Sequence, residues 1–507
     1  RDPPLEIRIM HGWTSLLLIL AAMLEPFEPS SSPIGGGLNP LLQTDLMVIH
    51  PPIVFAFYSL CIATSSVALA GFMRNDEPIV IHNSQLHWAR AGFLVGTIGI
   101  GLGGLWAYTV LDWGGYWAWD PVETGSLLPW LALLIILHAR ANTNSLATHV
   151  SPAVGMLAGA LAFHATLVTR ANGVWASVHA FVSDGEGSLP QDPYLRVLEI
   201  VDFDAVGAEI LGYMLSIVFL CYYSVMHLRR HQAESLAKSG RTTLIESNRS
   251  LSMILVFSFV AVSLWIGSVA TLLVGLSAII LLVEGDAQKP PTHWVALGVT
   301  LMLFSSWTWN SEWYQAFAGM IPFFVPWIMT EEEEGESWWI FNSASSRTRA
   351  AKSFPWYGGS AFLLLTWMIL TVEIDGTSLE AHEFYGAPII GMLALSLAAY
   401  SWGNSVDTRI GNSLLALALL LSLVFAYLAD MFSLPGDPHL PVTSFATRGA
   451  LSLFLLTLLA FSFLPVLRQA SSTASSAYKS ISKVGRIGLS PARTRLLASH
   501  LAHLGIL

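Results

Sequence analysis

Charged residues are scarce in this sequence. Only 11% of its 507 residues are charged, whereas 54% are hydrophobic, and the mean hydropathy is +0.59. A soluble domain could not keep that much apolar surface away from water. The net charge of −10 argues against a nucleic-acid partner, because such partners select basic surfaces. The composition therefore predicts an integral membrane protein in contact with lipid.

Cysteine is nearly absent as well. The chain has Cys61 and Cys221, which lie far apart in the sequence, each inside an apolar stretch. A disulfide framework needs several cysteines and a redox motif needs a CxxC pair, so both are excluded.

The sequence contains many long apolar runs. A helix needs roughly 20 apolar residues to cross a bilayer. Runs of that length lie at 46–73, 91–111, 149–170, 206–228, 251–283, 355–373, 386–403, 412–432 and 449–468, and shorter ones at 9–24, 125–138, 294–309 and 313–330. We expect an all-α polytopic membrane protein with about 11–13 transmembrane helices.

Clusters of Lys and Arg indicate the orientation. The positive-inside rule places the basic connections at 229–249 and 468–495 on the cytoplasmic side. Counting helices back from the first cluster puts 112–124 and 171–205 outside. The count to the second cluster has the wrong parity, so we expect the proline-containing segment 316–329 to be interfacial or re-entrant.

These features divide the chain. Its parts are an N-terminal apolar segment and outer loop (1–45), a core carrying both outer loops (46–250), additional transmembrane helices (251–468), a flexible basic cytoplasmic linker (469–495) and the start of a final helix (496–507). Because the last part is far shorter than a span, we expect the chain to be only a portion of the working unit.

The stretch "WGGYWAWDPVETGSLLPWL" at 113–131 is unusually rich in flat rings. Tryptophans often form an interfacial belt, which is the alternative here. A lipid anchor does not need glycines, a proline and acids, whereas glycines allow close backbone approach to a ligand. A porphyrin suits such a loop because its faces are apolar and aromatic. The candidate cofactor-binding residues are Trp113, Gly114, Gly115, Tyr116, Trp117, Trp119, Asp120, Pro121 and Glu123.

Two histidines lie near the same outer surface. His50 stands at the start of a span and His179 lies in the outer segment after the tryptophan loop. Either one alone is more often a hydrogen-bonded structural residue. Together with the aromatic loop they indicate axial ligands that bind a haem iron from opposite faces. Arg170 is a candidate partner for the haem propionates or for the acids of the loop, and an ordinary interfacial role is the alternative.

A second pair of histidines lies on the inner side. His138 is fifteen residues past Glu123, about 22 Å along a helix, so it cannot serve the outer site. A histidine inside a membrane is costly unless paired, although snorkelling to the interface is the alternative. His503 enters from the cytoplasmic side at a similar depth, which makes it the natural partner for an inner haem. We expect His82, His87, His227 and His231 to be hydrated in cytoplasmic connections.

Several motifs, taken in order, resemble one known family. "NPLLQTDLMVIHPP", the run from "RAGFLVGTIGIGLGG" through the tryptophan loop, "TLVTRANGVWASVHAF" and "LAHLG" are similar to the signatures of the cytochrome c maturation protein F family. This family belongs to the wider haem-handling proteins with a tryptophan-rich (WWD) outer loop. The resemblance covers residues 37–250 densely and the last dozen sparsely.

The resemblance implies a haem lyase in the plasma (inner) membrane, with its tryptophan loop on the outer, periplasmic side. Haem b held by His50 and His179 would be joined through its vinyl groups to the thiols of an apocytochrome c CxxCH motif. His138 and His503 would hold a b-type haem that keeps the outer iron reduced, with quinol as donor. Expected partners are apocytochrome c, a haem chaperone and a thiol-reducing subunit that delivers the apocytochrome. No catalytic residue beyond those that position haem is implied.

The sequence also departs from the family. Tyr116, Ala118 and Thr124 stand where the bacterial pattern more often has Trp, Phe and Asn, and the usual N-terminal helices are largely missing before residue 37. We therefore expect a second polypeptide to complete the fold, or the chain to be incomplete. Two other functions stay open: a haem exporter or relay without ligation, and a quinol-linked dihaem electron carrier.

Overall fold

The computed structural model describes most helices of the chain. The described residues are 3–27, 42–111, 117–139, 146–170, 177, 205–239, parts of 351–370, 379–435, 437–443, 446–484 and 491–506. The chain divides into two units, one of residues 1–334 with 359–379 and one of residues 335–358 with 380–507. Each unit is described by itself.

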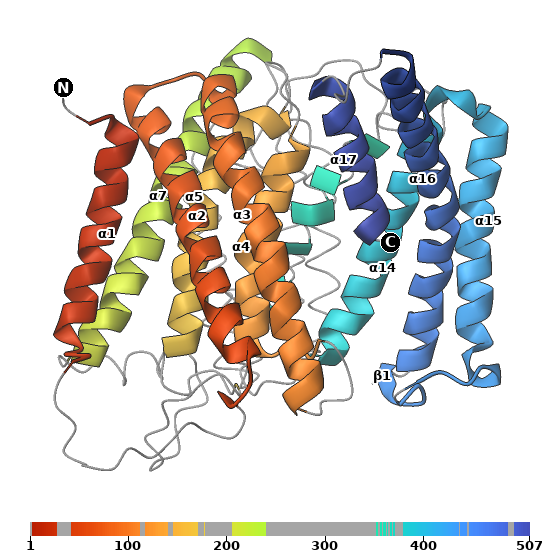
Figure 1. Ribbon diagram of the computed structural model, residues 1–507, viewed down its shortest axis with the longest axis horizontal. Helices are drawn as coiled ribbons and strands as arrows, with labels where there is room; N and C mark the ends of the chain where they lie inside the picture. The colour runs from red at the N-terminus through yellow and green to blue at the C-terminus, as the bar shows by residue number, and fades with distance from the viewer. Residues whose placement is uncertain are drawn as a thin grey trace. The chain divides into compact units, whose positions relative to one another are not determined.

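The first unit is a bundle of long helices that run side by side (Figure 1). Its described helices are α1 (Leu5–Met23), α2 (Leu46–Arg74), α3 (Pro78–Trp106), α4 (Pro121–His138), α5 (Leu146–Arg170) and α7 (Ala205–Ser239), and a short π-helix, η2 (Ala107–Leu111), follows α3. Asn75 ends α2 in the left-handed conformation, with φ of 62°. Pro78 then starts α3, since its fixed φ suits the first helical position.

Glycines bring α2 and α3 close together. A Cβ at Gly96 would lie 2.7 Å from the ring of Phe57, and one at Gly99 would lie 3.2 Å from Val54 Cγ2. Together with Gly92 and Gly103, these residues recur every three or four positions and therefore share one face of α3. Small residues at such spacing let helix backbones approach in a membrane protein, where packing replaces the hydrophobic effect between helices.

The first thirteen residues of α3 were not predicted as helix. The sequence placed 78–90 in a hydrated connection, and for His82 this is wrong. His82 is 1% exposed, and its Nδ1 is 2.7 Å from Ser151 Oγ of α5. Gln85 Nε2 donates to the same hydroxyl and to the Ser151 carbonyl. These interhelical hydrogen bonds satisfy polar groups that the sequence pattern assigned to water.

His227 of α7 is buried in the same region, which corrects a second prediction. It is 1% exposed, and its Nε2 is 2.9 Å from the carbonyl oxygen of His149 in α5. Ser224, one turn earlier, donates to the carbonyl of Ala153. The end of the bundle far from the tryptophan loop is thus bound together by side chains from α3, α5 and α7. His87 is exposed, as predicted, and nothing is described for the side chain of His231.

The second unit has helices α14 (Leu379–Trp402), α15 (Thr408–Tyr427), α16 (Arg448–Val484) and α17 (Pro491–Ile506). Asp407 caps α15 by accepting from the backbone N–H of Arg409. Leu395, Ala418 and Leu458 form a buried cluster between α14, α15 and α16. Between α15 and α16 lie the 3-10 helix η4 (Ala429–Met431) and a small antiparallel hairpin of β1 (Pro441–Thr443) and β2 (Ala446–Thr447).

The flexible linker predicted at 469–495 is wrong for its first half. Helix α16 continues without a break to Val484, because the Ser-, Ala- and Lys-containing stretch has neither glycine nor proline before Gly485. Ala470 and Ala477 are buried there, and α17 packs against α16. The final helix predicted at 496–507 is present and begins earlier, at Pro491.

Nine helices among the described residues are long and apolar enough to span a bilayer. They confirm an all-α polytopic membrane protein. The predicted segments 251–283, 294–309 and 313–330 lie outside the described residues, and 355–373 is described only in part. The total of about 11–13 helices therefore stays a prediction.

Candidate functional site

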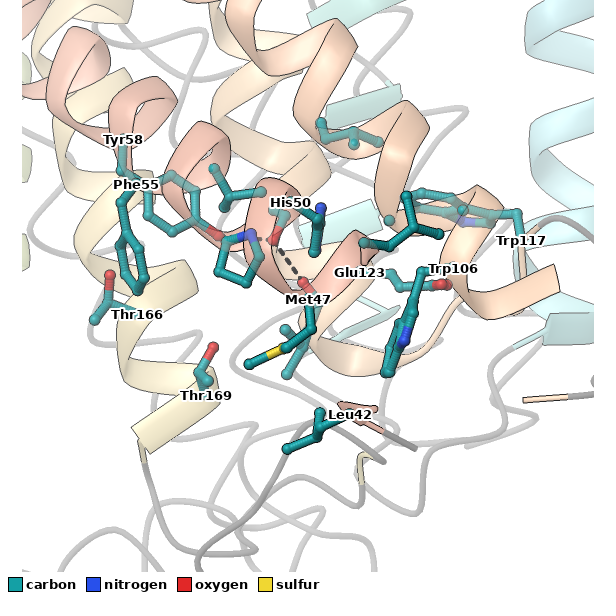
Figure 2. A pocket seen from close by; sticks show the side chains of 18 of the residues that line it. Leu42, Met47, His50, Phe55, Tyr58, Trp106, Trp117, Glu123, Thr166 and Thr169 are labelled. Atoms are coloured by element: carbon teal, nitrogen blue, oxygen red, sulfur yellow. Dashed lines mark hydrogen bonds between the residues drawn. The ribbon is translucent and has the colours of Figure 1, made fainter. Parts of the chain in front are cut away.

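A cavity of about 320 Å³ lies in the first unit among α2, α3, α4 and α5. Figure 2 shows His50 in its middle, with Trp106, Trp117 and Glu123 on one side and Phe55, Tyr58, Thr166 and Thr169 on the other. Its walls are mostly apolar. The remaining lining residues are Leu42, Leu46, Met47, Pro51, Val54, Ile100, Gly103, Gly104, Val122, Ser126 and Arg170. An apolar cavity with a few polar groups is the usual form of a small-molecule site.

His50 is held in one tautomer. Its Nδ1 lies 2.9 Å from the carbonyl oxygen of Gly99. A carbonyl can only accept, so Nδ1 carries the proton and the neutral imidazole keeps its lone pair on Nε2. The ring packs on the glycine face of α3, which fixes its plane. A hydrogen bond of this kind is the usual support of a histidine that ligates a metal.

The two acids of the tryptophan loop accept backbone hydrogen bonds that hold the loop in its conformation. Asp120 is the N-cap of α4, where its Oδ2 accepts from the backbone N–H of Val122 at 3.0 Å, and Pro121 follows at the first helical position. Glu123 Oε2 accepts from the N–H of Ala118 at 3.2 Å. The two acids are 7% and 9% exposed. Their carboxylates therefore have structural partners, and Glu123 in addition lines the cavity.

Two tryptophans of the loop are described. Trp117 lines the cavity, and its buried Nε1 has no hydrogen-bond partner among the described residues. Trp119 packs edge-on against Trp117, with ring centroids 6.0 Å apart, and against Phe362 at 6.3 Å. Its backbone has φ of +58°, which is rare for a bulky residue.

Trp130, although part of the same aromatic stretch, faces α3 outside the cavity. It stacks on Phe93 with ring centroids 4.8 Å apart and donates to Thr97 Oγ1 at 2.9 Å. The concentration of tryptophans in the sequence thus combines a packing residue with the loop proper.

Other predicted site residues lie outside the described residues. These are Trp113, Gly114, Gly115, Tyr116 and His179. Ser177 is described, and its Oγ donates to Asp120 Oδ2 at 2.7 Å. No sequence pattern predicted this bond.

Arg170 pairs with a residue that sequence reasoning missed. Its Nη2 is 3.0 Å from Glu209 Oε2 of α7, and its Nε is 3.2 Å from both carboxylate oxygens. Tyr213 donates its hydroxyl to Glu209 Oε1 at 2.8 Å. Of the roles considered for Arg170, the structure shows an ion pair with Glu209 and none with the acids of the tryptophan loop. Glu209 had a recognisable signal, since it is the one acid in the apolar run 206–228.

The two inner histidines lie in different units and are described separately. His138 is the last residue of α4, and its Nδ1 is 2.8 Å from the carbonyl oxygen of Leu134. As at His50, this bond leaves the lone pair on Nε2. His503 lies in the last turn of α17 and is half-buried. Among the described residues, no three His, Cys, Asp or Glu side chains are grouped as ligands of a bare metal ion.

Comparisons with known proteins cover both units. Residues 5–173 match the family described as cytochrome C assembly protein. The cytochrome c-type biogenesis protein CcmF of Pseudomonas aeruginosa is 28% identical over 451 residues, which is 84% of this chain and 60% of that protein. CcmF of Escherichia coli is 34% identical over 173 residues, 33% of this chain and 27% of that protein.

A related protein carries another name. The cytochrome c-type biogenesis protein NrfE of Haemophilus influenzae is 37% identical over 152 residues, 30% of this chain and 24% of that protein. No solved structure matches. The chain thus spans at most 60% of the length of these three relatives. The matched residues 5–173 include the helices that build the cavity, and the chain is similar to the CcmF proteins of cytochrome c-type biogenesis.

Proposed function

We propose that this chain acts in cytochrome c maturation by binding haem b in the cavity beside His50 and promoting its covalent attachment to apocytochrome c. The observation that carries the proposal is the His50 tautomer: an imidazole with its lone pair fixed on Nε2 stands in the wall of an apolar cavity that also contains Trp106 and Trp117. The similarity to cytochrome c-type biogenesis proteins supports the same pathway.

The residues present suit a porphyrin. The flat apolar ring system matches the apolar walls, imidazole nitrogen is a common axial ligand of haem iron, and acceptors at the porphyrin edge match Arg170 and the indole N–H of Trp117. His179 is proposed as the second axial ligand. The Asp120–Ser177 hydrogen bond supports this role, because it joins Ser177, two residues before His179 in the sequence, to the tryptophan loop.

Haem is the substrate and supplies two vinyl groups. In each addition, the sulfur of an apocytochrome CxxCH cysteine bonds to one vinyl carbon and the thiol hydrogen goes to the other, so atoms and electrons balance. The chain has only to hold haem and peptide in the reactive geometry, and such positioning can contribute about 7–11 kcal/mol to a bimolecular reaction.

An inner b-type haem held by His138 and His503 is part of the proposal, with quinol as its electron donor. The fixed tautomer of His138 supports it. The proposed partners are apocytochrome c, a haem chaperone, a thiol-reducing subunit that delivers the apocytochrome and a second polypeptide that completes the fold. We propose that the cavity faces the outer side of the plasma membrane, because the basic residues Arg229 and Arg230 lie at the opposite end of the bundle.

Reconstitution tests the proposal directly. The protein, purified together with its copurifying subunits, is incubated with haem and a reduced CxxCH peptide, and covalent haem–peptide product is measured by mass spectrometry. An SxxSH peptide is the control. Covalent product with the cysteine peptide alone supports ligation. Bound haem without product would identify a relay, and absence of haem binding would reject the site.

A further inference from the structure

Two of the hydrogen-bond donors that line the cavity, one on Arg170 and one on Trp117, are available to a ligand. Arg170 uses Nε and Nη2 for Glu209, and its Nη1 has no hydrogen-bond partner among the described residues. Trp117 Nε1 is buried and likewise lacks an acceptor among them. A buried donor without an acceptor is unfavourable, so the Trp117 indole calls for an acceptor on whatever fills the cavity, and the partly exposed Nη1 of Arg170 is able to donate to the same ligand.

Contacts with Glu209 hold the guanidinium of Arg170 in its orientation. The Glu209 side chain is 5% exposed, and it receives donors from Arg170 on both oxygens and from Tyr213 on one. A bidentate contact of this kind fixes the plane of an arginine, which a single hydrogen bond would leave free to rotate. The Arg170 side chain is 37% exposed, so its other edge remains accessible from the cavity.

The ion pair also sets the direction of the local field. Because Glu209 lies in α7 and is more deeply buried than Arg170, a group in the cavity meets the positive end of the pair first. Tyr213 lies one turn after Glu209 on the same helix face and donates a hydrogen bond to its carboxylate. Neither Glu209 nor Tyr213 lines the cavity.

We propose that the cavity recognises the two carboxylates of its ligand with Arg170 and Trp117, and that Glu209 and Tyr213 are positioning residues that aim Arg170. This inference rests on the proposed function, which identifies the ligand as a porphyrin and its carboxylates as the propionates. It adds a selectivity: the free diacid binds and a porphyrin whose acids are esterified binds poorly.

The test compares fluorescent zinc protoporphyrin with its dimethyl ester. Dissociation constants for both are measured in the assembled protein carrying His138→Ala, which removes the inner site from the measurement. The quantity of interest is the ratio of the two constants, ester over acid. Comparing this ratio between variants cancels the different partition of the two compounds into detergent.

Arg170→Gln is expected to lower the ratio by about tenfold or more, since a lost charge-assisted hydrogen bond of about 1.4 kcal/mol corresponds to tenfold. Tyr213→Phe is expected to lower it by about threefold, because the carboxylate and its arginine are less firmly held. Tyr222→Phe on the same helix, where the side chain is 57% exposed, is the matched control and leaves the ratio unchanged.

The outcomes separate the two proposals. If the His138→Ala protein binds neither porphyrin, the proposed haem site fails and the inference falls with it. If it binds both but Arg170→Gln leaves the ratio unchanged, the inference alone is overturned. If Tyr213→Phe weakens acid and ester equally, Tyr213 has a structural role and is not a positioning residue.

Discussion

The imidazole of His50 lies directly on Gly103. A Cβ at position 103 would be 2.7 Å from His50 Cε1 and 3.3 Å from Nε2. Both residues belong to the face along which α2 and α3 meet, so the ring cannot move closer to α3. The position of a proposed iron ligand is therefore set by the absence of a side chain on the neighbouring helix.

Gly103→Ala is expected to displace the imidazole and to lower haem binding at the outer site, because the added methyl and the ring cannot occupy the same space. Haem content is measured by absorbance in the His138→Ala background. Gly12→Ala in α1 is the control, since a Cβ there meets nothing within 4 Å, and it should leave haem content unchanged. Equal haem content in both variants would contradict the steric argument.

His50→Gly is expected to abolish covalent haem attachment, and added imidazole is expected to restore it. The cavity left by the side chain admits a free imidazole in place of the missing ligand. The readout is covalent haem–peptide product in the reconstituted reaction. His439→Gly, which removes an exposed histidine of the second unit that contacts Asp430, should have full activity without imidazole. Lack of rescue in a well-folded His50→Gly protein would count against ligation.

His138→Ala is expected to weaken the b-type haem spectrum while leaving haem binding at the outer site intact. The change removes the imidazole whose Nε2 lone pair is proposed to bind the inner iron. Difference spectra of the reduced protein report this loss. His11→Ala, at an exposed position of α1, is the control. An unchanged spectrum in His138→Ala would remove this residue from the inner site.

Asp120 and Ser177 are expected to be energetically coupled. Asp120→Ala should lower the free energy of unfolding by about 0.5–2 kcal/mol through loss of the N-cap. The double variant Asp120→Ala/Ser177→Ala should cost less than the sum of the single variants, with a coupling of about 0.5–3 kcal/mol. Unfolding in denaturing detergent measures each value. Asp120→Ala combined with Ser84→Ala serves as the additive reference, and additivity in the first pair would show that the bond contributes nothing.

Ser151→Ala is expected to destabilise the first unit by about 1–3 kcal/mol without changing haem binding. The hydroxyl joins His82 and Gln85 at the end of the bundle remote from the cavity, so its loss removes the partner of the buried His82 Nδ1, while Gln85 Nε2 keeps its bond to the Ser151 carbonyl. Ser84→Ala, whose hydroxyl bonds only within its own helix, should stay within about 0.5 kcal/mol of the unchanged protein. A similar cost for both serines would mean that the interhelical network adds no stability.

Apolar runs made much of the fold predictable. The run 46–73 predicted α2 to within one residue, since membrane thickness leaves little freedom in helix length. The start of α3 was not predictable in this way, because the polar side chains of His82 and Gln85 are satisfied only by Ser151 of another helix. Local sequence records hydrophobicity and does not record which distant partner completes a buried hydrogen bond.

The candidate site was likewise predictable from the sequence only in part. His50 and the tryptophan loop could be found because their residue types are unusual at their positions. The partner of Arg170 could not be assigned by spacing, since Glu209 is 39 residues away along the chain. The role of Asp120 as the N-cap of α4 and the hydrogen bond of Glu123 to the loop N–H of Ala118 follow from backbone geometry, which a motif does not specify.

The backbone conformation of Trp119 lowers the stability of the tryptophan loop. A tryptophan at φ of +58° costs about 1–3 kcal/mol relative to an unstrained backbone, and glycine would adopt this conformation without that cost. Evolution towards maximal thermal resistance would therefore favour glycine at position 119. Because the Trp119 ring packs against Trp117, which lines the cavity, heat-resistant variants with glycine at position 119 are expected to lose support for the cavity wall.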